Sequence, residues 1–301
     1  MNLPIFRQML YVSPSMFLKW RMCQQKVYLS RLAGHTYPEA DRSYPASVGT
    51  AFDAFIKDYI AKKRGMISPV LQLDFLLKGL SKESIEHGRI IAKAYIISEW
   101  IKPLLEAKDL KLEQEVYANF GGIPILGRID AIINDIPLDW KVRGIRSVNK
   151  MYPTKGYGER YEYDLSTDKG TKVIYLANQK VPQDIPLELR NEDWAIQLLF
   201  YNWLVRSTPY KFQIHEIVQQ DNKLIFVNHE YIITLAFSNK IKAELDQMWK
   251  CIAGHLYHAE IEEPRPRTQI CESYGSLCEV AQFCTAYMKT LGDPERRVNY
   301  V

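Results

Sequence analysis

The sequence predicts an α/β protein, because strand patterns and helical patterns alternate along most of it. Segments rich in β-branched, aromatic and other apolar residues read as strands at 113–120, 127–133, 136–141, 211–220 and 223–233. Helical patterns occur at 13–31, 48–64, 70–107, 192–206 and 238–258. A sheet that packs against helices is the simplest arrangement that buries both kinds of apolar face.

Length and composition fit this prediction and exclude some classes of protein. The 301 residues are enough for a full core, and 47% hydrophobic and 25% charged residues are typical of a globular chain. The net charge of +4 permits nucleic-acid binding without arguing for it. No secretory signal or membrane-spanning segment is recognisable, so we expect a cytoplasmic protein, or one of the host cytoplasm if viral, without a membrane partner. Oligomerisation is left open.

The first helix carries a start signal and a cysteine. Ser13 is expected as its N-cap and Pro14 as its first residue. Cys23 falls in an apolar stretch, where a lone cysteine is by default a small buried hydrophobe. In the next helix Asp53 lies in the predicted first turns, where an acid commonly answers the helix dipole. These residues alone do not indicate chemistry.

The strands at 127–133 and 136–141 form the most informative stretch, joined by a tight turn at Asn134 and Asp135. Asp139 and Lys141 are two apart on one strand and share a face, which Asp130 can reach from the neighbouring strand. A buried sheet tolerates such charges when they pair or bind metal. Two acids and an ammonium suit metal-assisted phosphodiester hydrolysis. The alternative is a solvated hairpin end with a weak surface ion pair.

Three other features have two interpretations each. Glu115 could add an oxygen to this site, although a solvated strand acid is the simpler interpretation. The irregular, basic and aromatic segment 144–190 is either a loop that contacts nucleic acid or a solvated insertion. Gln197 and Tyr201 share a face of a buried helix, so their polar groups need partners, either structural or at the metal site.

The cysteines suggest a second metal centre. Cys271, Cys278 and Cys284 are closely spaced, and Cys23 is the best candidate for a fourth ligand, whereas Cys251 is expected in the core. Four thiolates fit an iron–sulfur cluster or a structural zinc ion. The tight pair of cysteines usual in zinc sites is absent.

Together these motifs resemble the RecB-like branch of the PD-(D/E)XK nucleases. Within it they are similar to the iron–sulfur subgroup that includes the AddB nuclease domain, CRISPR-adaptation exonucleases and phage exonucleases. The resemblance extends over nearly the whole chain and is poorest at 144–190. The motifs stand in the family's order: Ser13-Pro14-Ser15 with Cys23; Gly49-Thr50-Ala51-Phe52-Asp53; Gly127-Arg128-Ile129-Asp130; Asp139-Trp140-Lys141; Gln197 to Tyr201; and the three terminal cysteines.

The resemblance implies an architecture. Residues 1–301 would form one nuclease domain with a restriction-endonuclease-like core, a central mixed sheet flanked by helices. Residues 13–32 and 262–290 would together form an iron–sulfur subdomain from both termini. Residues 144–190 would be an insertion or substrate loop.

It also implies site residues and cofactors. Mg²⁺ or Mn²⁺ would be held by Asp130, Asp139, the backbone carbonyl of Trp140, and Asp53, which stands where the family usually has histidine. A [4Fe–4S] cluster, or alternatively structural Zn²⁺, would be held by the four cysteines named above. The catalytic residues would be Asp130 and Asp139, with Lys141 positioning or activating the water and Gln197 and Tyr201 contacting the site or the nucleic-acid backbone.

The expected activity is therefore a metal-dependent DNA exonuclease acting on single-stranded DNA or duplex ends, in recombination, repair or processing. Two alternatives remain. One is a non-catalytic scaffold that binds DNA ends, and the other is a nuclease subunit active only with a helicase, recombination or CRISPR-adaptation partner. The presence together of Asp130, Asp139 and Lys141 favours catalysis.

Overall fold

The computed structural model describes residues 11–28, 43–66, 72–144, 159–174, 186–206, 210–220, 222–257, 272–273 and 276–277. The chain divides into two compact units. The larger comprises Arg42–Phe120 and Ile125–Ser238, and the smaller comprises Met1–Asp41, Gly121–Pro124 and Asn239–Val301.

A seven-stranded mixed sheet organises the larger unit. Its strands lie in the order β1-β2-β3-β6-β7-β4-β5, and β3 pairs with β6 in parallel while the neighbouring pairs β2·β3, β6·β7, β7·β4 and β4·β5 are antiparallel. This confirms the predicted mixed sheet. The strands are β1 (Leu110–Phe120), β2 (Ile123–Ile133), β3 (Ile136–Gly144), β4 (Glu159–Asp164), β5 (Lys169–Ile174), β6 (Lys211–Gln220) and β7 (Lys223–Ile232).

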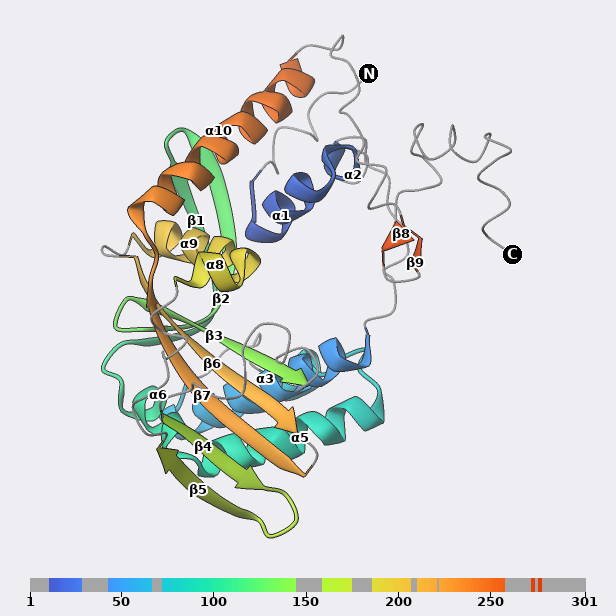
Figure 1. Ribbon diagram of the computed structural model, residues 1–301, viewed down its shortest axis with the longest axis vertical. Coiled ribbons are helices and arrows are strands. Elements are labelled where there is room, and N and C mark those ends of the chain that lie inside the picture. Colours follow the sequence, from blue (N-terminus) through green and yellow to red (C-terminus); the bar gives the residue numbers. More distant parts are fainter. Residues whose placement is uncertain are drawn as a thin grey trace. The chain divides into compact units, whose positions relative to one another are not determined.

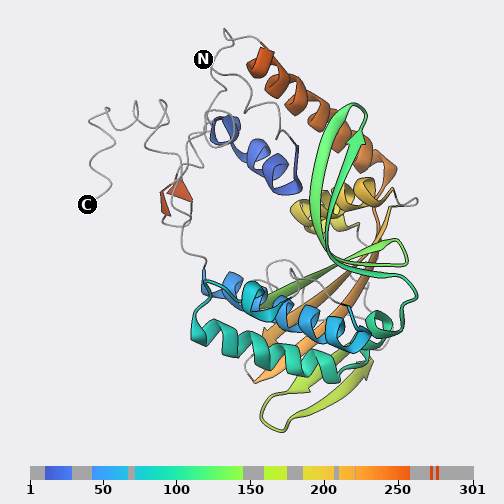
Figure 2. The same ribbon diagram turned by 180° about the vertical axis from the view of Figure 1, so that it is seen from behind.

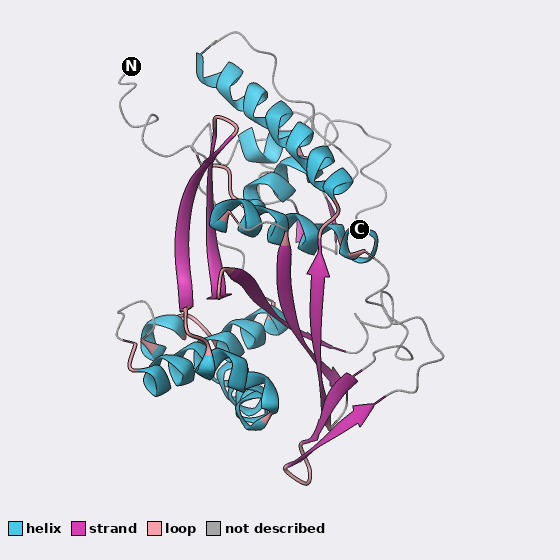
Figure 3. Cartoon of the chain, turned by 90° about the vertical axis from the view of Figure 1, so that its left-hand side faces the viewer, coloured by secondary structure: helices cyan, strands magenta, loops and turns pink. Residues whose placement is uncertain are grey.

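Helices flank this sheet, as predicted. Helices α3 and α5 lie side by side along the strands (Figures 1 and 2), and Figure 3 shows them gathered beside the sheet. Helix α9 packs on β1, β3 and β6. The helices of this unit are α3 (Tyr44–Arg64), α4 (Leu73–Leu76), α5 (Lys82–Ile97), the 3₁₀ turn η4 (Glu99–Ile101), α6 (Lys102–Glu106), α8 (Leu187–Arg190) and α9 (Glu192–Val205).

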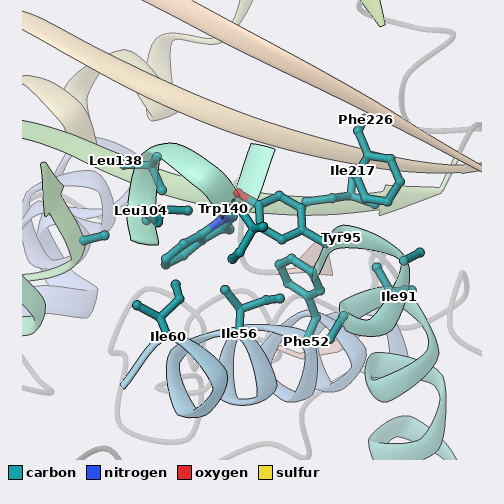
Figure 4. Close-up of a cluster of buried hydrophobic side chains, with 14 of the residues drawn as sticks. Phe52, Ile56, Ile60, Ile91, Tyr95, Leu104, Leu138, Trp140, Ile217 and Phe226 are labelled. Atoms are coloured by element: carbon teal, nitrogen blue, oxygen red, sulfur yellow. Dashed lines mark hydrogen bonds between the residues drawn. The ribbon is translucent and has the colours of Figure 1, made fainter. Parts of the chain in front are cut away.

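The core between α3, α5 and the sheet fixes which way β3 faces. Leu138 and Trp140 are buried in it, and Figure 4 shows side chains of α3, including Ile56, directed at them. Because side chains alternate along a strand, Asp139 and Lys141 point to the opposite face, toward α9. The apolar pattern of β3 therefore decides where its charged residues lie.

Gly88 allows α3 and α5 to approach closely. A Cβ atom at Gly88 would lie 2.5 Å from the Cβ of Ala51 and 2.7 Å from the backbone nitrogen of Phe52. Such distances are far below van der Waals contact, so only glycine fits here. The crossing at Gly88 sets the position of the α3 turn that precedes Asp53.

The smaller unit contains α1 (Pro14–Met22), α2 (Gln24–Val27), most of α10 (Leu235–Tyr257) and a hairpin of β8 (Glu272–Ser273) and β9 (Ser276–Leu277). Ser13 caps α1 by accepting a hydrogen bond from the Met16 N–H at 3.2 Å, as predicted. Arg21 on α1 forms a 2.8 Å ion pair with Glu244 on α10. Among the described residues, no helix is both long and apolar enough to cross a membrane.

Several sequence predictions are wrong in detail. Helix α3 begins at Tyr44 rather than Val48, with Pro45 in its first turn. Part of the segment predicted to be irregular, 159–174, forms the β4–β5 hairpin. Cys251 is exposed rather than in the core. The first helix is interrupted at Cys23, where the backbone becomes extended between α1 and α2.

Candidate active site

The β2–β3 hairpin brings two acids together. Its turn residues Asn134 and Asp135 both adopt left-handed backbone angles, φ 48° and 64°, which match the twist of a tight hairpin. The register pairs Ala131 with Leu138, so its continuation places Asp130 opposite Asp139. The Asp130 charge raises the pKa of Asp139, and Lys141 beside Asp139 helps to lower the pKa of Asp130, so the two carboxyl groups lie close enough to interact. The predicted convergence of these two acids on one face is confirmed.

Lys141 completes the first half of the site. Its Nζ lies 2.5 Å from Asp139 Oδ2 as an ion pair and donates to Gln197 Oε1 at 3.2 Å. The Gln197 amide in turn donates to Asp139 Oδ1 at 3.2 Å and to the Tyr201 hydroxyl at 2.8 Å. We call Asp139, Lys141, Gln197 and Tyr201 the Lys141 group. Of the two interpretations of Gln197 and Tyr201, the structure supports contact with the site.

Helix α9 presents Gln197 and Tyr201 because it can lie close to β2. A Cβ atom at Gly127 would lie 2.5 Å from Leu204 Cδ1 and 3.4 Å from the Tyr201 ring. The glycine of the Gly127–Asp130 motif thus makes room for the helix, three residues before the acid that the same strand supplies.

Lys57, which sequence reasoning missed, forms the second half. Its Nζ lies 2.5 Å from Asp53 Oδ2 and 3.0 Å from Asp130 Oδ1, and it also contacts Glu113 Oε1. The Lys57 side chain is 0% exposed, and its Nζ lies 5.8 Å from the centre of the Trp140 ring. We call Lys57, Asp53, Glu113 and Asp130 the Lys57 group.

Glu113 also escaped the sequence analysis, which considered Glu115 instead. The Glu113 backbone has φ 49°, a left-handed angle inside β1 that breaks regular strand alternation and re-aims the side chain. Glu115 is exposed and pairs with Arg128 at 3.3 Å, so its interpretation as a solvated strand acid is confirmed. No sequence signal distinguishes the two glutamates, since regular alternation would place both on one face.

Asp53 has a different role from the one its predicted place suggested. Because α3 begins at Tyr44, Asp53 lies in the third turn, beyond the reach of the helix dipole. Its partner is Lys57, one turn further on. An acid followed by a lysine at i+4 was the available signal for Lys57.

The pKa values of Asp139 and Asp130, which lie where the Lys141 group meets the Lys57 group, are shifted in opposite directions. Burial raises the pKa of Asp139 to about 6, with the Asp130 charge adding to the effect and Lys141 opposing it. Burial also raises the pKa of Asp130, but the charges of Lys57 and Lys141 outweigh it and hold that pKa below its ordinary value. The crowded acids would both be stabilised by a further cation.

The Lys57 group holds its charges tightly. Burial lowers the pKa of Lys57, but the three surrounding carboxylates outweigh it, so the net shift is upward and the ammonium stays protonated. Burial and the nearby Asp130 charge raise the pKa of Asp53. Counted as fully ionised, the four carboxylates of both groups exceed the two ammonium groups by two charges.

A buried polar network supports β3 behind the acids. The Trp140 indole donates to the Tyr95 hydroxyl at 3.2 Å, and that hydroxyl is hydrogen-bonded to Nδ1 of His215. Trp140 and His215 are also register partners across β3 and β6. Figure 4 shows the Trp140 and Tyr95 rings meeting in the core. These contacts fix Trp140, which stands between Asp139 and Lys141 on β3.

The donor set fits a hard divalent cation. Oxygens of Asp53, Glu113 and Asp130 lie within 4.8 Å of one another. Asp53 Oδ1 is buried and has no hydrogen-bond partner among the described residues, and the partner of buried Asp139 Oδ2 is the Lys141 ammonium. Carboxylate oxygens with unused acceptor capacity suit Mg²⁺ or Mn²⁺. Ligation by the Trp140 carbonyl stays a prediction.

The cysteine centre stays a prediction as well. Cys23 is buried at the end of α1. Cys271, Cys278 and Cys284 lie outside the described residues. Neither the iron–sulfur nor the zinc alternative is tested, nor is the proposed subdomain of residues 13–32 and 262–290.

Comparisons with known proteins support the fold. No protein-family model and no curated protein matches the chain. Among solved structures, the chain is similar to a protein from Eubacterium rectale named "Putative exonuclease", with a TM-score of 0.51 and 15% sequence identity. The similarity covers 93% of this chain and 87% of the other. At this identity it shows a shared fold.

Proposed function

We propose that the protein is a metal-dependent deoxyribonuclease of the RecB-like PD-(D/E)XK type. The observation that carries the proposal is the meeting of Asp130, Asp139 and Lys141 at the β2–β3 hairpin, on a fold like that of the similar protein named an exonuclease. Two neighbouring acids each destabilise the charged form of the other, and a bound cation relieves that cost.

Asp130 and Asp139 are the proposed ligands of Mg²⁺ or Mn²⁺, with the Trp140 carbonyl as a further oxygen. When bound, the metal ion would polarise the scissile phosphate and neutralise charge that develops on the leaving oxygen. Asp53 is paired with the Lys57 ammonium, which also contacts Oδ1 of Asp130.

Lys141 is the proposed positioning group for the attacking water. The Lys141 side chain is 21% exposed and its ammonium is held between Asp139 and Gln197, so it can donate a hydrogen bond toward water or a phosphate oxygen. The water oxygen bonds to phosphorus while the bond to the sugar oxygen breaks. Solvent takes the proton released by water and returns one to the leaving oxygen, so the products are a phosphate monoester and a hydroxyl.

Trp194 offers a contact for the nucleic acid. It lies at the start of α9, partly buried, with Lys141 Nζ 5.7 Å and Arg143 Cζ 4.9 Å from its ring centre. Aromatic rings beside cationic groups suit a base and its phosphate. DNA is therefore the proposed substrate, at single strands or duplex ends.

The test is digestion of end-labelled single- and double-stranded DNA with Mg²⁺ or Mn²⁺. Wild-type protein should release labelled product, and Lys141→Met and Asp139→Asn should each reduce the rate by about 10²-fold or more. The matched control is Lys111→Met, because Lys111 pairs with Asp109 at 3.2 Å across the same i,i+2 spacing on the protein surface. That control should cleave at the wild-type rate.

Two outcomes point elsewhere. DNA retention without product in either ion would favour the end-binding scaffold and reject catalysis. Product that appears only after a helicase, recombination or CRISPR-adaptation partner is added would identify a dependent subunit. Visible absorbance of protein purified without oxygen, lost in Cys23→Ser, tests the proposed [4Fe–4S] cluster against Zn²⁺.

A further inference from the structure

The Lys57 group resembles a metal site in its ligands, yet a side-chain ammonium already fills it. Asp53 from α3, Glu113 from β1 and Asp130 from β2 converge from three different elements. The same three carboxylates are the partners of Lys57 Nζ.

The ammonium and a divalent ion cannot share that position. Mg²⁺ binds oxygen at about 2.0–2.1 Å, so an ion ligated by all three carboxylates would overlap an Nζ placed 2.5 Å from Asp53 and 3.0 Å from Asp130. The Lys57 side chain is 0% exposed, and its Nζ lies 5.8 Å from the centre of the Trp140 ring, so the ammonium is buried where the three carboxylates meet.

From this arrangement we infer that Lys57 is a tethered substitute for a second divalent cation, and that it limits the nuclease site to one metal ion, held at Asp130 and Asp139. The inference rests on the proposed function for the identity of that single site. Lys57 is a positioning residue here: it fixes Asp130 and neutralises Asp53 and Glu113 without touching the substrate.

The inference predicts how many divalent ions the protein binds with and without the Lys57 ammonium. Removing the ammonium while keeping the three carboxylates should open a second site for a hard cation, since their oxygens already lie within 4.8 Å of one another. Lys57→Met removes the charge and keeps an unbranched apolar stem. Lys62→Met is the matched control, because Lys62 pairs with Asp58 at 2.8 Å on the same helix with the same i,i+4 spacing, but is 72% exposed.

Mn²⁺ titration followed by the electron paramagnetic resonance of free ion counts the bound ions directly. Wild type and Lys62→Met should each bind one ion, and Lys57→Met should bind two. The double variant Lys57→Met/Glu113→Gln should return to one. Cysteine thiolates are soft ligands that suit Mn²⁺ poorly, so they should not add to the count.

A wild-type stoichiometry of two, or a Lys57→Met stoichiometry of one, overturns the inference. If Lys57→Met does not fold even with Mn²⁺, Glu113→Gln decides in the otherwise native chain. Because Lys57 shields Glu113 from the metal, that variant should keep one ion with less than a threefold change in affinity, and loss of the ion overturns the inference.

The outcomes separate this inference from the proposed function. A wild-type protein that binds one Mn²⁺ but cleaves no DNA rejects the nuclease and leaves the role of Lys57 standing. A wild-type protein that cleaves DNA but binds two ions supports the nuclease and overturns the inference about Lys57. A wild-type protein that binds no Mn²⁺ overturns the inference, and cleavage is then judged by the digestion assay alone.

Discussion

Lys57 and Lys141 serve the same cluster of acids from opposite environments. Lys57 is fully buried and contacts three carboxylates, whereas Lys141 is 21% exposed and contacts one carboxylate and one amide oxygen. A buried ammonium with saturated contacts is held for structure and charge balance. A partly exposed one with fewer partners is free to serve a substrate. The difference suggests that Lys57 holds the acids in place, while Lys141 acts on the substrate.

The two halves also depend on different parts of the core. The Lys57 group is placed by α3, whose position is set by its close crossing with α5 at Gly88. The Lys141 group is completed by α9, which approaches β2 over Gly127. Each half can therefore be disturbed by a single methyl group, at a site away from the charged residues themselves.

The largest expected difference between the halves is in stability. In a chelating buffer, Lys57→Met should lower the free energy of unfolding by about 3–5 kcal/mol, because it leaves buried carboxylates without their cation. Lys141→Met should lower it by about 1–2 kcal/mol, because Asp139 keeps its hydrogen bond from Gln197. Urea denaturation followed by circular dichroism measures both. Equal losses of unfolding free energy in the two variants would contradict these separate roles of Lys57 and Lys141.

Gly88→Ala should have the next largest effect, and it acts on the Lys57 half. Glycine to alanine inside a helix ordinarily stabilises by up to about 1 kcal/mol, but here the new methyl group meets backbone of α3, so we expect a loss of about 2–3 kcal/mol. The control is Gly49→Ala on α3, where a Cβ would lie 4.0 Å from Val142 Cβ. Thermal denaturation should show the control unchanged or stabilised; a stabilised Gly88→Ala would show that the helices can separate without cost.

Gly127→Ala should have the smallest effect on stability and act on the Lys141 half. The new methyl group meets the end of the Leu204 side chain, which can rotate, so a loss of about 1 kcal/mol is expected. Because Tyr201 lies on the same helix, the rate of DNA cleavage should fall more than stability does. Chemical denaturation and the digestion assay on one sample test this. An unchanged cleavage rate would show that the position of α9 does not affect catalysis.

Much of the fold could be predicted from the sequence because its signals are local. The cap at Ser13, the turn at Asn134 and Asp135, and the alternation that puts Asp139 and Lys141 on one face depend on neighbouring residues and backbone geometry. The β4–β5 hairpin was missed because its strands carry many charged residues and lack the apolar pattern of the other strands. Cys251 was misplaced because a helical pattern does not say which face is covered.

By itself, the sequence determined the hairpin that joins Asp130 to Asp139, and the facing pair of Gln197 and Tyr201, since the periods of strands and helices place those residues within a few positions of one another. Only the tertiary structure decided that Lys57 and Glu113 enter the same site. They come from α3 and from a left-handed residue of β1, 56 positions apart in the chain. Packing between distant elements, which no local pattern encodes, brings their charges together.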